Sequence, residues 1–193
     1  VSGSMHSPDY LPISVSIALG LYISERNKSI FKDAFITFSG HPTMQYIKPG
    51  TLHSRVHQLS TADWGMNTDL QAVFSLILSK AIANNLTEDD MPTKVVIISD
   101  MEFDSAVGYH GDTNFHAIEQ RYAQAGYKRP QIIFWNVNGR TGNCPVQIGT
   151  EGTALVSGFS PAILKDILKG DIGTPESFVY RVLMSDRYKE VTL

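Results

Sequence analysis

Six residues at positions 94–99, KVVIIS, restrict the fold of this chain more than any other segment. The run is almost wholly apolar, is rich in β-branched residues, and ends at Asp100. A strand with one face in water alternates apolar and polar residues, whereas a parallel strand covered on both faces reads as a continuous apolar run. We therefore predict that 94–99 is a central strand of a mostly parallel sheet.

Four other short runs are typical of strands. Residues 34–38 (AFITF) and 43–47 flank the turn residues SGHP, so the pair is predicted to form an antiparallel hairpin at the sheet edge. Residues 131–137 (QIIFWNV) form a second buried run, and 154–157 a third. The sequence thus contains several candidate strands for one sheet.

Helical patterns separate these strands. The first helix follows Ser7-Pro8-Asp9, which are good helix-start residues. Its apolar positions are Leu11, Val15, Leu19, Tyr22 and Ile23. Further helices are predicted at 51–59, from about 70 to 81, at 113–125, and in two final segments that open at Ser160-Pro161 and Thr174-Pro175. The helix near 70 has one apolar face, made of Leu70, Val73, Phe74, Ile77, Leu78 and Ala81.

Helices between strands imply right-handed crossovers and a parallel sheet. We predict an α/β fold: a doubly wound, mostly parallel, Rossmann-like sheet with helices on both faces and one antiparallel edge strand. A chain of 193 residues, 42% of them hydrophobic, can bury one substantial core. We expect a single domain over 1–193.

Charge and cysteine content argue against several classes of function. The net charge is -3, and the Lys and Arg residues are scattered, so direct nucleic-acid binding is not expected. Cys144 is the single cysteine, which fits a reducing compartment, and we expect a cytoplasmic protein. No apolar run approaches the roughly 20 residues that span a bilayer, so no membrane association is expected.

Small oxygen-bearing side chains stand where strands end or helices begin. Ser2 and Ser4 precede the first helix, Thr68 precedes the long helix, and Asp100 follows the strand at 94–99. In parallel α/β sheets such junctions meet at the carboxyl edge. Two serine hydroxyls, a threonine hydroxyl and a carboxylate suit a hard divalent cation, Mg²⁺ first and Mn²⁺ or Ca²⁺ as alternatives.

This set resembles the metal-ion-dependent adhesion site of von Willebrand factor A domains, whose pattern is DxSxS, a distant Thr and a distant Asp. The sequence segments VSGSM, NTDLQ and ISDMEFD are particularly similar to the A-like domain at the C-terminus of a poorly characterised family of plants, fungi, bacteria and large DNA viruses. A more distant resemblance is to the A domain of the Ro ribonucleoprotein family. The resemblance covers nearly the whole chain.

The start of the chain departs from that pattern. The aspartate of DxSxS would lie immediately before Val1, and so would the strand that leads into it. We expect this first strand to lie between the strands at 34–38 and 94–99, so those two should not pair directly. Without the aspartate the cation would lose a ligand or a stabilising charge, and its affinity would fall.

The resemblance implies a binding module, and not an enzyme, in which the cation accepts an Asp or Glu carboxylate of a protein partner. The chain would then be part of a larger multidomain protein. One alternative is a metal-dependent hydrolase or phosphotransferase that uses Asp100, Glu102 and Asp104. Another is a structural domain with a degenerate metal site, within a larger protein or ribonucleoprotein.

Each candidate ligand also has a purely structural interpretation. Ser2 and Ser4 have ordinary linker composition, Thr68 is suited to cap a helix, and Asp100 could bond backbone N–H groups at a strand end.

Other polar groups give weaker signals. His53 and His57 are four residues apart and would share a helix face, but no third zinc ligand is evident. An acidic loop near Asp100, made of Glu102, Asp104 and Asp112, is more typical of a solvated surface.

Overall fold

The structure is a computed structural model, and it describes residues 5, 12–37, 41–62, 69–99, 111–137 and 152–158, with the single positions 164, 180, 183 and 184. The chain divides into two compact units, Val1–Gly158 and Phe159–Leu193. In the second unit Leu164, Tyr180 and Leu183 are helical, whereas the helix starts predicted at Ser160 and Thr174 lie outside the described residues. The elements below all belong to the first unit.

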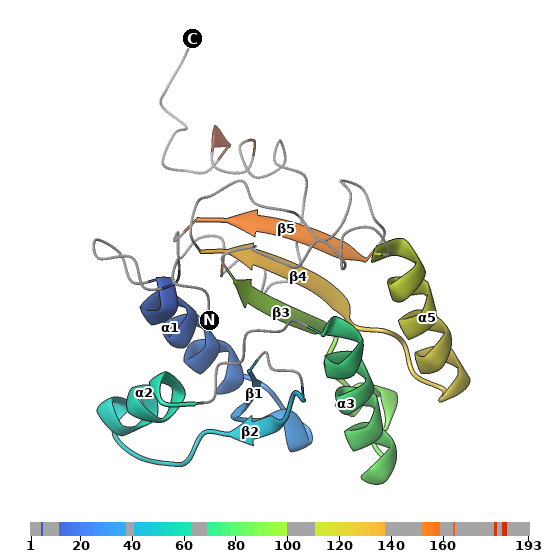
Figure 1. The fold of residues 1–193 in the computed structure, drawn as a ribbon, viewed down its shortest axis with the longest axis horizontal. Helices are drawn as coiled ribbons and strands as arrows, with labels where there is room; N and C mark the ends of the chain where they lie inside the picture. The colour runs from blue at the N-terminus through green and yellow to red at the C-terminus, as the bar shows by residue number, and fades with distance from the viewer. Residues whose placement is uncertain are drawn as a thin grey trace. The chain divides into compact units, whose positions relative to one another are not determined.

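A three-stranded parallel sheet organises this unit (Figure 1). Its strands are β3 (Lys94–Ser99), β4 (Gln131–Asn136) and β5 (Thr153–Ser157), in the spatial order β3-β4-β5. The three predicted strands are therefore confirmed, and so is their parallel pairing. The prediction that the third strand is buried is wrong, because Leu155 of β5 is 43% exposed and no residue of this strand is fully buried. The chain has a mixed α/β fold.

One detail of the prediction is wrong for the part of the chain that the structure describes, where β3 is not central. Within the described residues β4 has strands on both sides, and β3 lies at an edge of the sheet. The side chains of β4 from Ile132 to Trp135 are fully buried, whereas most of those in β3 are only half-buried. An apolar run indicates that both faces of a strand are covered, but it does not report how many strands flank it.

Two further strands form a separate antiparallel sheet, β1 (Ala34–Ile36) and β2 (Met44–Tyr46). The predicted hairpin is confirmed, with Phe35 opposite Gln45. Strands β1 and β3 belong to separate sheets, so the described residues contain no direct pairing of β1 with β3.

Helices α3 (Leu70–Ala83) and α5 (Gly111–Gln124) pack against each other over one face of the parallel sheet. All six predicted apolar positions of α3 are buried, which confirms that helix and its face. Ile132 and Phe134 of β4 join the same core, while Ile133 and Trp135 alternate to the opposite face and are equally buried. Both faces of β4 are thus covered, as the apolar run predicts.

Helices α1 (Pro12–Ser24) and α2 (Leu52–Ser60) form a second, smaller core, in which Ile17 and Leu21 meet Leu59. Glu25 and Arg55 join the two helices by an ion pair of 2.6 Å.

The predicted apolar face of α1 is wrong. Tyr22 is 40% exposed, whereas the small residues Ser16 and Ser24 are buried. The Ser16 hydroxyl donates to the Pro12 carbonyl oxygen, and the Ser24 hydroxyl donates to the Leu21 carbonyl oxygen. Because each hydroxyl has a hydrogen-bond partner within the helix, serine can occupy a buried position.

A cavity of about 210 Å³ lies between the two sheets. It is bordered by β1 on one side and by β3 on the other, and α1 and α3 contribute to its lining. None of the helices described here is long and apolar enough to span a lipid bilayer.

Candidate functional site

The carboxyl edge of the parallel sheet is built from three residues in register. Ser99 ends β3 opposite Asn136 of β4, and Asn136 lies opposite Ser157 at the end of β5. The pairing continues one residue further, because Val137 N donates to Ser99 O (3.0 Å) and Gly158 N donates to Asn136 O (3.1 Å). Asp100 is therefore the first residue after β3 in the sequence, next to this paired sheet edge, although Asp100 itself lies outside the described residues.

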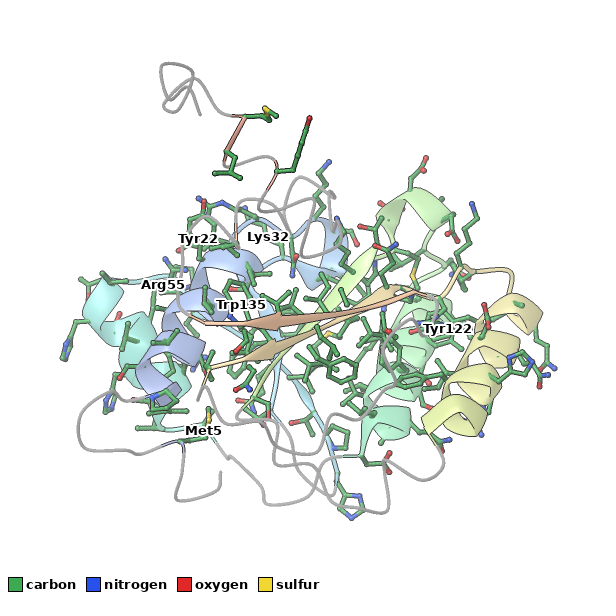
Figure 2. All side chains as sticks on the ribbon, turned by 90° about the horizontal axis from the view of Figure 1, so that it is seen from above. Met5, Tyr22, Lys32, Arg55, Tyr122 and Trp135 are labelled. Atoms are coloured by element: carbon green, nitrogen blue, oxygen red, sulfur yellow. The ribbon has the colours of Figure 1, made fainter. Side chains whose placement is uncertain are left out.

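Trp135 fixes the chain where β5 ends. Its indole Nε1–H donates a hydrogen bond of 2.8 Å to the carbonyl oxygen of Gly158, and the Trp135 side chain is fully buried. Gly158 has φ of 106°, a conformation that L side chains rarely adopt. Figure 2 labels Trp135 among the densely packed side chains near the strands. The sequence analysis did not identify this contact, because it joins residues 23 apart.

The N-terminus of α3 is capped by Asp69. The Asp69 carboxylate accepts a hydrogen bond of 2.9 Å from Ala72 N, and the Asp69 backbone is extended as a capping residue requires. The interpretation of Thr68 as the cap of this helix is therefore wrong, because the adjacent residue holds that position. The sequence signal that could have identified this cap is an aspartate directly before the first apolar residue of the helix, Leu70.

All four predicted metal ligands, Ser2, Ser4, Thr68 and Asp100, lie outside the described residues. Glu102, Asp104 and Cys144 do so as well, and of Asp112 only the backbone is described, within α5. Among the residues that the structure does describe, no cluster of three or more His, Cys, Asp or Glu side chains could hold a metal ion.

The two histidines considered as a zinc pair lie on α2. The predicted helix is confirmed, so His53 and His57 are one turn apart, and both are exposed. Thr51 caps this helix by accepting a hydrogen bond from Ser54 N.

A buried tyrosine joins the two helices that cover the sheet. The Tyr122 hydroxyl of α5 donates a hydrogen bond of 3.0 Å to the Phe74 carbonyl oxygen of α3, and the two rings meet edge to face. Burial raises the pKa of Tyr122 far above its usual value, and the positive charge of Arg129 opposes this only in part. Tyr122 is labelled beside α5 in Figure 2. This hydrogen bond and ring contact hold α3 and α5 together.

Comparison with known proteins gives one family over almost the whole chain. Residues 1–190 match the family described as a domain of unknown function, DUF7788. The chain belongs to this family.

A relative of this domain is the uncharacterized protein L728 of Acanthamoeba polyphaga mimivirus, which is 32% identical over 186 residues. The match covers 95% of the chain but 32% of the viral protein, so the chain spans about a third of that relative's length. No solved structure matches the chain.

Proposed function

We propose that this DUF7788 domain is a protein-interaction module that holds a divalent cation at the carboxyl edge of its parallel sheet. Ser2, Ser4, Thr68 and Asp100 would provide the ligands, with Mg²⁺ the first choice and Mn²⁺ or Ca²⁺ the alternatives. In this proposal the arrangement is von Willebrand factor A-like, and the sheet is doubly wound.

The register at the carboxyl edge is the observation that carries the proposal. Ser99, Asn136 and Ser157 end their strands side by side, and Asp100 follows Ser99 directly in the sequence. In parallel α/β sheets ligands bind beyond this edge. An aspartate at that position in the sequence is therefore well suited to a site.

The cap of α3 supports the role of Thr68. Because the Asp69 carboxylate already accepts from Ala72 N, the Thr68 hydroxyl is not required to cap the helix. A hydroxyl next to a helix start can then serve as a ligand, and the first turn of the helix adds N–H groups that favour a nearby anion.

A carboxylate from a protein partner fits such a site. An octahedral cation has coordination positions beyond those that the four ligands fill. Three of the four ligands are neutral hydroxyls, so most of the cation's charge is not compensated. An Asp or Glu side chain from a partner would supply both a ligand and a negative charge. The chain spans only part of its viral relative, so we place the module within a larger protein, in the cytoplasm as its single cysteine suggests.

Catalysis is the second candidate, with Asp100, Glu102 and Asp104 around the cation. A hydrolase or phosphotransferase needs more carboxylates and a base poised by burial. The hydroxyl-rich set favours binding without chemistry. A third candidate is a structural domain whose metal site is degenerate.

Calorimetric titration of the full-length protein with Mg²⁺ tests the proposal. We expect saturable binding that EDTA reverses and that Asp100→Ala weakens at least about tenfold, because the only carboxylate among the four ligands is lost. Asp89→Ala is the matched control, since Asp89 is exposed on a short 3-10 turn before the amino end of β3, whereas Asp100 follows the carboxyl end of that strand.

Stability must be measured on the same samples. Unchanged Mg²⁺ affinity in a folded Asp100→Ala protein would reject the site and favour the structural domain. Mg²⁺-dependent hydrolysis of a phosphate ester, lost in Glu102→Gln, would favour the enzyme.

A further inference from the structure

The outer edge of β5 carries main-chain groups that do not bond to β4. Ile132 N donates to Gly152 O and Gly158 N donates to Asn136 O, so the even-numbered residues of β5 bond to β4. In a parallel ladder the alternate residues point the other way. The N–H and C=O groups of Leu155 therefore point away from β4, and they meet no further strand in the described part of the chain (Figure 1).

The edge of β5 lacks the residues that usually protect a strand edge from pairing. Such edges are commonly guarded by lysine or other charged residues, by proline, or by a bulge. Residues 153–157, TALVS, include no charged residue and no proline, and their pairing with β4 runs without a bulge. Strand β2, in the other sheet, lies instead between Pro42 and Pro49. The sequence of β5 therefore leaves its edge able to pair with another strand.

Leu155 lies at the centre of this edge. The residue is 43% exposed, and Ser157, two residues further along the strand and so on the same face, is exposed as well. A strand that pairs with β5 would bond the N–H and C=O groups of Leu155 and would cover part of its side chain. Both changes stabilise the pairing, because main-chain bonds give attachment and the leucine side chain gives apolar surface.

The sequence of β5 is self-complementary when two copies pair antiparallel about Leu155. The two Leu155 residues then form a hydrogen-bonded pair, in which each N–H donates to the C=O of the other. In this register Thr153 lies opposite Ser157, and Ala154 lies opposite Val156. Hydroxyl residues thus meet hydroxyl residues and apolar residues meet apolar residues, which are favourable cross-strand pairs. A residue on a two-fold axis meets its own copy, so an uncharged residue such as leucine suits that position.

We propose that β5 is a dimerisation edge, at which two copies of this chain pair antiparallel with their two-fold axis at Leu155. The pairing joins the two parallel sheets into one continuous sheet, in the order β3-β4-β5-β5-β4-β3. A contact of this kind uses the same edge on both copies, so it closes after two chains and does not extend into a filament. The inference goes beyond the proposed function, because it uses none of the four cation ligands.

Analytical ultracentrifugation of the full-length protein at increasing concentration tests the proposal. We expect the average mass to rise from that of one chain toward that of two, and no further. Leu155→Lys should weaken the association at least about tenfold, because two like charges meet at the axis and apolar contact is lost. Leu52→Lys is the matched control, since Leu52 is 68% exposed on α2 and its replacement should leave the association unchanged.

Circular dichroism establishes that each variant is folded. A native protein that is monomeric at every concentration would overturn the proposal, and so would a folded Leu155→Lys protein that dimerises as strongly as the native one.

A charge-swap pair tests the position of the two-fold axis. Leu155→Lys and Leu155→Glu should each be monomeric alone, whereas an equimolar mixture should form a heterodimer, because opposite charges then face each other. A mixture that stays monomeric at concentrations where the native protein dimerises would show that Leu155 does not face its own copy, which contradicts the proposal.

Amide hydrogen exchange, resolved by residue with NMR, identifies what covers the edge. Protection of the Leu155 N–H should rise with protein concentration. The Val156 N–H belongs to the ladder with β4, so its protection should not change and it serves as the internal control. Protection of Leu155 that is strong at every concentration would show that another segment of the same polypeptide pairs with β5, and would overturn the proposal.

Discussion

The indole of Trp135 and the carbonyl of Gly158 are joined by a hydrogen bond of 2.8 Å. This bond ties the carboxyl end of β4 to the first residue after β5, at the edge where the cation site is proposed. Because the indole N–H is fully buried, the contact both satisfies a donor and fixes the exit of β5.

We expect Trp135→Phe to lower the free energy of unfolding by about 2–4 kcal/mol, from the unpaired Gly158 carbonyl and from the lost volume. Urea denaturation followed by circular dichroism measures the change. Tyr46→Phe is a surface control: Tyr46 is 46% exposed, and its loss should cost less than about 0.5 kcal/mol. A midpoint unchanged in Trp135→Phe would show that the bond contributes nothing.

Asp69 and Thr68 should separate helix capping from cation binding. Asp69→Ala removes the acceptor for Ala72 N, and we expect a loss of about 1 kcal/mol of stability, largely recovered in Asp69→Ser. Thr68→Ala should leave stability within about 0.5 kcal/mol but weaken Mg²⁺ binding. Thr43→Ala, at an exposed position before β2, should change neither quantity. If Thr68→Ala destabilised the protein as much as Asp69→Ala, the assignment of the cap would be wrong.

The buried phenol of Tyr122 should make the domain sensitive to alkaline pH. Its pKa in the folded protein is raised above the unfolded value of 10.0, so the unfolded chain releases the proton first as pH rises. The contribution of Tyr122 to the free energy of unfolding is therefore fully present below pH 10. Above about pH 10 it falls by about 1.4 kcal/mol for each pH unit.

Denaturation at pH 9 to 11 should show this extra loss in the native protein and not in Tyr122→Phe. The matched control is Tyr127→Phe, which also removes a hydroxyl bonded to a backbone carbonyl, that of Leu86. It keeps Tyr122 and should keep the steep dependence. Parallel pH profiles for the native protein and Tyr122→Phe would contradict the prediction.

Two glycines with positive φ offer a matched pair. Gly126 has φ of 81° and nothing within 4 Å of an added Cβ, so Gly126→Ala should cost only the strain of that conformation, about 1 kcal/mol. At Gly152, with φ of 70°, the added Cβ would lie 2.6 Å from Arg129 Nη2. We expect Gly152→Ala to cost more than Gly126→Ala, as measured by thermal denaturation, and equal losses would show that the Arg129 side chain moves freely.

The sequence by itself determined the three parallel strands, the hairpin and the buried face of α3. The apolar runs at 94–99 and 131–137 are strands because continuous β-branched and aromatic residues suit a sheet covered on both faces. The face of α3 could be read from its 3.6-residue period, because six apolar residues on one side leave a single way to bury them. The positions of Asp100 after a strand and of Thr68 before a helix follow from the same patterns.

Tertiary structure decided which strands are neighbours and which polar residues are buried. Among the described strands β3 lies at an edge, and this cannot be read from its side chains, because pairing depends on backbone groups that every residue carries. The burial of Ser16 and Ser24 on α1 depends on their bonds to the carbonyls of the preceding turn. The contact of Trp135 with Gly158, and that of Tyr122 with Phe74, arise only once distant segments pack together, since neither partner marks the other in the sequence.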